Sequence, residues 1–199
     1  MKKLLLVVVA LALVFAVSVP SQAQGKMSLS VGGDLLLPLG SFGDAVSMGF
    51  GGSVRGQYDI TPMFSAGVTV GYYTWSAKSS GIASYSFHGL PFRVFGKYYF
   101  MPEGKLRVYG MFELGLFFGS TGDITVPGTT IPGLGTFGGG TVAGASSTDF
   151  NYVPEVGLEF PLGSGKTKLD ASIRYDGIAT SGGSGNLGFR VGVNFPIGS

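Results

Sequence analysis

Apolar residues alternate with polar or small residues along most of this chain, with a period of two. In the last segment of this kind, one face carries Leu187, Phe189, Val191, Val193 and Phe195, and the other carries Gly188, Arg190, Gly192 and Asn194. Such alternation is typical of β-strands that bury only one face. Eight segments follow it, so we predict strands over residues 26–37, 47–58, 63–75, 84–100, 106–120, 150–162, 167–178 and 187–197. No segment has a convincing helical period, and the pattern predicts an all-β domain.

The connections between these segments alternate in length. Short turns rich in Pro and Gly occupy residues 59–62, 101–105 and 163–166, and longer connections occupy residues 38–46, 76–83, Thr121–Asp149 and 179–186. Short turns at one end and long loops at the other indicate an up-and-down meander that closes into a barrel. We therefore expect a single antiparallel transmembrane β-barrel of eight strands, with both ends of the chain on the short-turn side. A barrel of ten strands, with two more built from Thr121–Asp149, is the structural alternative.

Charged residues occur on the strand face opposite the apolar one. The basic residues on this face are Arg55, Arg93, Lys97, Arg107, Arg174 and Arg190, and the acidic ones are Asp34, Glu113, Glu155, Glu159, Asp170 and Asp176. An eight-stranded barrel has an interior just wide enough for side chains to fill, and buried charges persist only when they are paired. We therefore predict a lumen plugged by ion pairs, with Arg93, Arg107, Arg174 and Arg190 facing Glu113, Glu155, Glu159 and Asp170. The alternatives are a soluble sheet with a wet charged face, or a soluble barrel whose apolar face points inward.

Aromatic residues flank the apolar face near both ends of the strands. Toward the short turns lie Tyr58, Phe64, Tyr98, Phe100, Phe160 and Phe195, and toward the long loops lie Phe50, Tyr72, Phe118 and Tyr175. Two such rows are typical of the aromatic girdles of membrane barrels. Nearly all segments also have the ten or so tilted residues that cross a bilayer. These features favour a face that contacts lipid over a soluble sheet.

The N-terminus has the features of an export signal. Lys2 and Lys3 precede an apolar stretch over residues 4–17, and small residues stand at Ser21 and Ala23. This pattern predicts a cleaved signal peptide over residues 1–23 and a mature barrel over residues 24–199, with an uncleaved membrane anchor as the alternative. Loss of the two lysines leaves eleven basic and eleven acidic residues, so charge gives no reason to expect a nucleic-acid partner. The absence of Cys excludes disulfides, thiolate nucleophiles and lipoprotein processing.

Several short stretches resemble a known family. They are Leu37-Pro38-Leu39-Gly40-Ser41-Phe42, Phe50-Gly51-Gly52, Gly96-Lys97-Tyr98-Tyr99-Phe100 and the closing stretch from Gly188 to Phe195. Through them the chain resembles the small bacterial outer-membrane β-barrels of the porin family, or OmpA-like eight-stranded barrels. The resemblance implies a place in the bacterial outer membrane, contact with its lipids, and insertion by the barrel-assembly machinery. Residues 196–199 extend past Phe195, whereas family members usually end on the aromatic residue that this machinery recognises.

The sequence offers little catalytic chemistry. Gly165-Lys166-Thr167 copies the end of a phosphate-binding loop, but Phe160 replaces its leading glycine and a strand follows instead of a helix. His88 is the single histidine, so a metal site is not expected. As a general base it would need a partner, for which Ser84, Ser86, Asp123 and Asp149 are the nearest candidates. We therefore expect no catalytic residue, cofactor or metal, and a non-enzymatic protein.

The longest connection is the main candidate for a contact with other molecules. Thr121–Asp149 contains eight glycines and repeated Thr, Ala and Ser, which indicates a flexible surface segment, with a short hairpin through residues 123–126 as an alternative. Because loops on rigid scaffolds often carry function, an extracellular partner of this loop is expected first. This favours a structural or surface-interaction protein. A narrow channel for small or apolar solutes and an enzyme that modifies envelope lipids are the alternatives.

Overall fold

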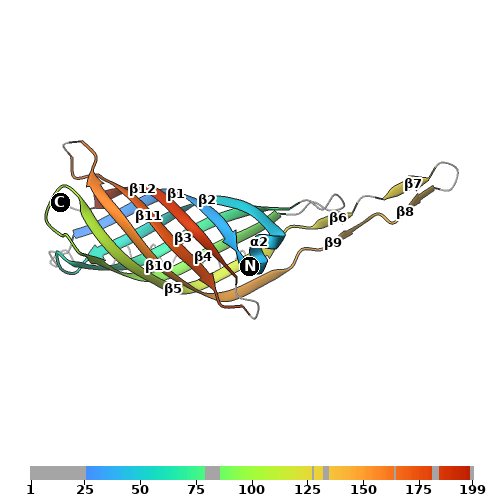
Figure 1. Cartoon of the computed structure of the whole chain (residues 1–199), viewed down its shortest axis with the longest axis horizontal. Coiled ribbons are helices and arrows are strands. Elements are labelled where there is room, and N and C mark those ends of the chain that lie inside the picture. The colour runs from blue at the N-terminus through green and yellow to red at the C-terminus, as the bar shows by residue number, and fades with distance from the viewer. Residues whose placement is uncertain are drawn as a thin grey trace.

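Eight long strands form a closed barrel in the computed structural model, which describes residues 26–78, 86–126, 128–131, 135–163, 165–180 and 184–197 (Figure 1). The barrel strands are β1 (Lys26–Leu39), β2 (Val46–Asp59), β3 (Phe64–Ala77), β4 (Ser86–Tyr99), β5 (Arg107–Thr121), β10 (Ser146–Pro161), β11 (Lys168–Ile178) and β12 (Ser184–Ile197). Each strand pairs antiparallel with its neighbours in the order β1-β12-β11-β10-β5-β4-β3-β2. The predicted up-and-down barrel of eight strands is confirmed.

The first and last strands close the barrel. The β1–β12 register runs from Met27 opposite Ile197 to Leu39 opposite Gly185, so β1 begins and β12 ends at the short-turn end. The observed strands agree with the predicted ones to within a few residues, β10 excepted, which begins at Ser146 and not at residue 150. Ser84, the predicted start of the fourth strand, and the predicted signal peptide over residues 1–23 lie outside the described residues.

The first long connection contains a short helix that the sequence pattern does not predict. The helix α2 (Gly40–Ala45) follows β1 directly, and Gly40 has a positive φ of 63°, a conformation that glycine adopts at little cost. Phe42 of this helix packs edge-on against Trp75 and Phe87, with ring centroids 5.5 and 5.2 Å apart. Six residues are too few to show a helical period, and packing holds this turn in place. Among the described residues, none of the helical structure is long and apolar enough to cross a membrane.

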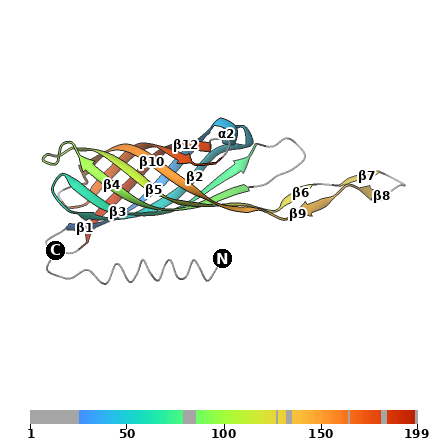
Figure 2. The ribbon, with the colours of Figure 1, turned by 90° about the horizontal axis from the view of Figure 1, so that it is seen from below.

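Part of the longest connection forms a narrow ribbon that extends β5 and β10 far beyond the barrel (Figures 1 and 2). Its strands are β6 (Ile124–Val126), β7 (Thr129–Ile131), β8 (Gly135–Phe137) and β9 (Gly140–Val142). β6 pairs with β9, and β7 pairs with β8. The ten-stranded alternative is therefore wrong, because these strands pair with one another and not with the barrel wall. The hairpin alternative for residues 123–126 is the one observed.

Side chains alternate between the two faces of the barrel wall as the sequence pattern predicts. The outward apolar residues are largely exposed, for example Val31 at 48% and Val191 at 58%. Inward positions combine charged residues with large aromatic rings, and glycine on a neighbouring strand gives these rings space. A Cβ atom on Gly157 of β10 would overlap the ring of Tyr109 on β5. The core of this protein is therefore the polar interior of the barrel.

Candidate functional site

The layer of lumen side chains nearest to the short turns is centred on Glu159 of β10. Its Oε1 accepts hydrogen bonds from Lys97 Nζ at 2.5 Å and from the Tyr99 hydroxyl at 2.9 Å. Arg107 and Lys168 lie 3.6 and 3.5 Å from Oε2. The Arg107 guanidinium also stacks 3.6 Å above the Tyr99 ring. One buried carboxylate thus contacts three cationic side chains, and these four residues occupy the lumen at this end.

The middle layer contains a two-pronged ion pair. Arg55 donates from Nη1 and Nη2 to the two carboxylate oxygens of Glu155, at 2.8 and 2.5 Å. The Tyr109 hydroxyl donates to Glu155 Oε1 at 3.0 Å. Glu113 lies beside this pair, 3.3 Å from Arg55 Nη2 and 3.2 Å from Arg93 Nη1. Glu113 therefore connects the middle of the lumen to the layer above.

Arg190 of β12 fills the side of the lumen that is formed by β1, β2, β11 and β12. Its guanidinium donates to Asp170 at 3.0 Å, and to the hydroxyls of Ser53 and Ser30 at 2.9 Å each. Gly32 on β1 leaves the space for it, because a Cβ there would come within 2.7 Å of the Arg190 guanidinium carbon. Each nitrogen of this buried guanidinium therefore donates to a partner on a different strand.

The upper layer joins two arginines through one carboxylate. Asp176 accepts from Arg93 Nη2 at 2.5 Å and from Arg174 Nε at 2.7 Å. Arg174 also donates to Asp34 at 2.6 Å and to the Tyr73 hydroxyl at 3.1 Å. These contacts span the lumen from β11 to β1, β3 and β4, so the layer braces the barrel wall from within.

An apolar cap covers this network at the long-loop end. Its buried members are Leu36, Val46, Tyr73, Trp75, Phe117 and Ile178, with Phe42 and Phe87 packed against them. The gap between the cap and the upper layer, bordered by Trp75, Arg93 and Asp176, has no room for a water molecule. At the opposite end, a cavity of about 310 Å³ reaches only as far as Arg107 and Lys168. The lumen is therefore filled by side chains at successive levels.

The structure places all twelve charged residues that the sequence assigns to the lumen on the inner face of the barrel. All but Arg107 are buried, and the Arg107 side chain is only 14% exposed. Arg93, Arg107 and Arg190 each contact a carboxylate of the expected set. Arg174 contacts Asp34 and Asp176 instead. The reason is the level of each residue along the barrel axis, which the strand pattern alone does not give.

Sequence reasoning missed two charged residues of the lumen. Lys168 contacts Glu159, and Asp59 accepts hydrogen bonds of 2.7 Å from Gln57 and from Ser65. Both obey the alternation, since Lys168 shares its face with Asp170 and Asp59 shares its face with Gln57. They stand at strand ends, where the boundary between strand and turn hides the pattern. One cation and one anion are added, so the balance of charge in the lumen is kept.

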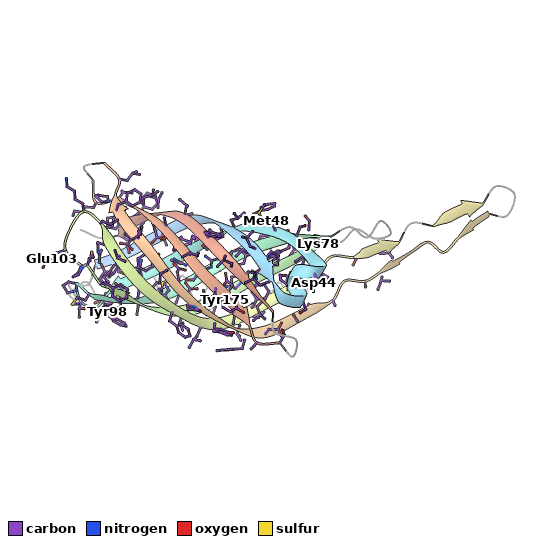
Figure 3. All side chains as sticks on the ribbon, in the orientation of Figure 1. Asp44, Met48, Lys78, Tyr98, Glu103 and Tyr175 are labelled. Atoms are coloured by element: carbon purple, nitrogen blue, oxygen red, sulfur yellow. The ribbon has the colours of Figure 1, made fainter. Side chains whose placement is uncertain are left out.

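The ten predicted girdle residues lie on the outward face. Eight of them are more than a third exposed: Phe50, Phe64, Tyr72, Tyr98, Phe100, Phe160, Tyr175 and Phe195. Tyr58 and Phe118 are half-buried. Tyr98 lies at the short-turn end and Tyr175 lies further toward the other end (Figure 3). The outward face also has a groove of about 570 Å³ between Phe64, Tyr98, Phe112 and Ile173.

His88 of β4 lies on the outward face near the long-loop end and contacts two hydroxyls. Its Nδ1 is 2.9 Å from the Tyr72 hydroxyl, its Nε2 is 2.9 Å from Ser86 Oγ, and its ring stacks on Tyr72. The expected carboxylate partners make other hydrogen bonds: Asp123 accepts from the Gly144 backbone and Asp149 accepts from Ser147. The described acidic residues include none that contacts His88. In the same part of the chain, no cluster of His and carboxylates has the composition of a metal site.

Comparison with known proteins identifies the architecture. The family described as outer membrane protein beta-barrel domain matches residues 9–195. Neisserial surface protein A is 18% identical with a TM-score of 0.54, over 85% of this chain and 97% of that one. A major outer membrane protein from Thermus thermophilus is 15% identical with a TM-score of 0.56, over 86% and 99%. The attachment invasion locus protein Ail of Yersinia pestis, in complex with the heparin analogue sucrose octasulfate, is 13% identical with a TM-score of 0.54, over 86% and 99%. A search among curated protein sequences found no match.

Proposed function

The chain belongs to the outer membrane protein beta-barrel domain family, and from this we propose that it is a solute-tight, non-enzymatic barrel that acts through contacts at the bacterial surface. The observation that carries the proposal is the filled lumen. Arg174 of β11 donates to Asp34 on β1 and to the Tyr73 hydroxyl on the facing strand β3, and its side chain is fully buried, so at this level side chains cross the interior of the barrel. A barrel plugged in this way would transmit no solute, which supports a function at its outer faces.

The ribbon supports a role in contacts outside the membrane. It projects beyond β5 and β10 at the long-loop end of the barrel. The start of β1 and the end of β12 lie at the other end (Figure 2). Two proteins of similar fold are described as a surface protein and as an attachment protein bound to a heparin analogue. Their low identity shows the shared fold alone, and the ribbon is the feature of this chain that supports a corresponding role.

We place the barrel in the outer membrane, with the apolar outer face against lipid and the two aromatic rows at its interfaces. The groove between Phe64, Tyr98, Phe112 and Ile173 is lined chiefly by apolar groups and would be filled by lipid acyl chains. In this proposal the predicted signal peptide over residues 1–23 is removed during export, and the barrel-assembly machinery inserts the mature chain.

Two measurements test this function. The full-length protein in planar lipid bilayers should give no steady single-channel current. A variant in which an Asn-Gly turn replaces residues 124–142 should still show the heat-dependent gel shift of a folded barrel, because the Thr121–Ala145 backbone hydrogen bond at the ribbon base remains. Cells that carry this variant should lose a surface contact that wild-type cells make. A current from the wild-type protein would favour the narrow channel, and a current that appears only in the variant would identify the ribbon as a plug.

A second candidate function is ester hydrolysis at the membrane surface, favoured by the hydrogen bond between Ser86 Oγ and His88 Nε2. If Nδ1 donates its proton to the Tyr72 hydroxyl oxygen, Nε2 can accept the serine proton as Oγ attacks an ester carbonyl. The alcohol then leaves with that proton, and a water molecule releases the acid from Ser86 through the same histidine. A fluorophosphonate probe should label Ser86 in the wild type but not in Ser86→Ala or His88→Ala. We rank this function second because no described carboxylate orients His88, and absence of labelling would eliminate it.

A further inference from the structure

The two arms of the ribbon differ in one chemical property. The arm that leaves the barrel, residues 124–134, contains Pro127 and Pro132, whereas the arm that returns, residues 135–148, contains no proline. Neither arm contains a charged residue. Proline lacks the amide hydrogen that a neighbouring strand would bind, so it prevents strand addition along an edge. Proline in the sequence of the outgoing arm therefore opposes strand addition along that arm, whereas the sequence of the returning arm has no such residue.

The returning arm is open to a further strand. In the described part of the ribbon, β9 pairs only with β6 and β8 only with β7, so each strand has a second edge that faces outward. Every residue over 138–148 is exposed, and Val142 is 60% exposed. Natural sheets usually protect such edges with charge, proline or a covering element. The described part of the returning arm has none of these protections, which is typical of an edge that pairs with another chain.

We propose that the returning arm pairs, edge to edge and antiparallel, with the returning arm of a second copy held in an opposing membrane. This inference rests on the proposed surface-contact function and names its partner. When the returning arm pairs with its own copy, the result is a two-fold pair in which the same surface is used twice, and such a pair is closed and does not grow into a filament. Proline in the sequence of the outgoing arm also disfavours growth, because it opposes strand addition along that arm.

Strand direction explains why the second copy faces the first. The returning arm runs toward the barrel, and the barrel fixes that direction relative to the membrane (Figure 1). Copies side by side in one membrane would bring their returning arms together parallel, whereas copies in facing membranes bring them together antiparallel. Antiparallel pairing is the more stable arrangement per residue. Gly138, Gly139, Gly140 and Gly144 weaken each strand pair, so many copies acting together would be needed to hold two surfaces, and the contact would be reversible.

The lack of native cysteine allows a direct test of this geometry. Single cysteines are introduced one at a time over residues 138–147 of the full-length chain, displayed on cells without other surface adhesins. Antiparallel two-fold pairing places only the position at the symmetry axis opposite itself, so oxidation should give dimers at one or two neighbouring positions. Parallel pairing within one membrane would give dimers along the whole arm and would overturn the proposal.

A matched pair of charge variants tests the contact between cells. Thr141 and Thr125 lie opposite each other in the ribbon, on the returning and outgoing arms. In a mixture of two differently coloured populations, Thr141→Lys on both should reduce mixed aggregates by about tenfold. Thr141 lies near the middle of residues 138–147, where an antiparallel pair that uses the whole arm has its symmetry axis, so like charges then repel across the pair. Thr125→Lys should have little effect, and mixing Thr141→Lys cells with Thr141→Glu cells should restore aggregation. Wild-type cells that stay dispersed while the ribbon deletion abolishes binding to another surface would refute self-pairing and leave the proposed function standing. Loss of no contact at all would refute both.

Discussion

The ion pair between Arg55 and Glu155 allows the packing of the lumen to be tested by comparison with its neighbour Glu113. The Arg55 and Glu155 side chains are 5% and 0% exposed, and two hydrogen bonds join them. The change Glu155→Gln removes the negative charge and leaves Glu113, at 3.3 Å, as the remaining carboxylate near Arg55. Loss of one partner of a buried pair costs about 3–5 kcal/mol, so we expect the free energy of unfolding to fall by that amount.

Glu113→Gln should cost less, although Glu113 is equally buried. After this change Arg55 keeps Glu155 at 2.5 Å, and Arg93 keeps Asp176 at 2.5 Å. Each arginine then loses only its longer contact, and the expected cost is about 1.5–3 kcal/mol, the range for a hydrogen bond to a charged group. The double change Arg55→Met with Glu155→Leu should cost less than the sum of its single changes, because neither charge is left without a partner.

Urea unfolding of the refolded protein in detergent micelles, followed by the gel shift of the folded barrel, measures these differences as shifts of the transition midpoint at constant slope. The gel shift in the absence of urea shows that each variant still folds. Equal losses for Glu155→Gln and Glu113→Gln would contradict the ranking of contacts. An additive double change would show that the pair contributes nothing beyond the volume of its side chains.

Three further predictions concern glycine packing, the apolar cap and the signal peptide. Gly157→Ala should destabilise the barrel by about 1–3 kcal/mol, because its Cβ would displace the Tyr109 ring. Gly33→Ala, where a Cβ meets nothing within 4 Å, should be near neutral in the same urea assay. Trp75→Ala should lower stability by about 3–5 kcal/mol yet give no current in planar bilayers, since the ion pairs below the cap still fill the lumen; a steady current would assign the seal to the cap alone. Mass spectrometry of the protein purified from outer membranes should find Gln24 at the N-terminus, and a retained segment of residues 1–23 would refute cleavage.

Much of the fold is predictable because a barrel strand has a strict period. Inward and outward residues alternate, so the twelve charged residues that the alternation places on the polar face lie on the inner side of the wall, while Lys168 and Asp59 at strand ends were missed. The turn lengths then indicate which strands neighbour each other. The helix α2 was not predictable in this way, because its position depends on the contact between Phe42 and Trp75, which lie on different elements. The same applies to the ribbon, whose three-residue strands are too short to show a period.

The partners across the lumen depend on information that no single strand contains. Arg174 and Asp34 are 140 residues apart and meet only because the stagger and tilt of the strands set them at one level. The equal numbers of acidic and basic residues on the polar face indicate that charges pair, but they do not indicate which residues are partners. His88 shows the same limit: its contact with Ser86 follows from i and i+2 sharing one face, whereas its contact with Tyr72 requires the β3–β4 register.

The barrel and the ribbon are held by separate sets of contacts, so substitutions in one should leave the other unchanged. Contacts at the ribbon base hold the two arms without help from the lumen, since Thr121 and Ala145 exchange hydrogen bonds and the Gly144 amide donates to Asp123. Substitutions beyond this base leave every ion pair of the lumen untouched, so they should alter surface contacts without a cost in barrel stability. Substitutions in the lumen should lower barrel stability and leave surface contacts unchanged, because the arginines there bond to residues of several strands. Stability and surface contact are therefore separable by mutation in this chain, and a variant that changes both from a position beyond Asp123 would contradict that division.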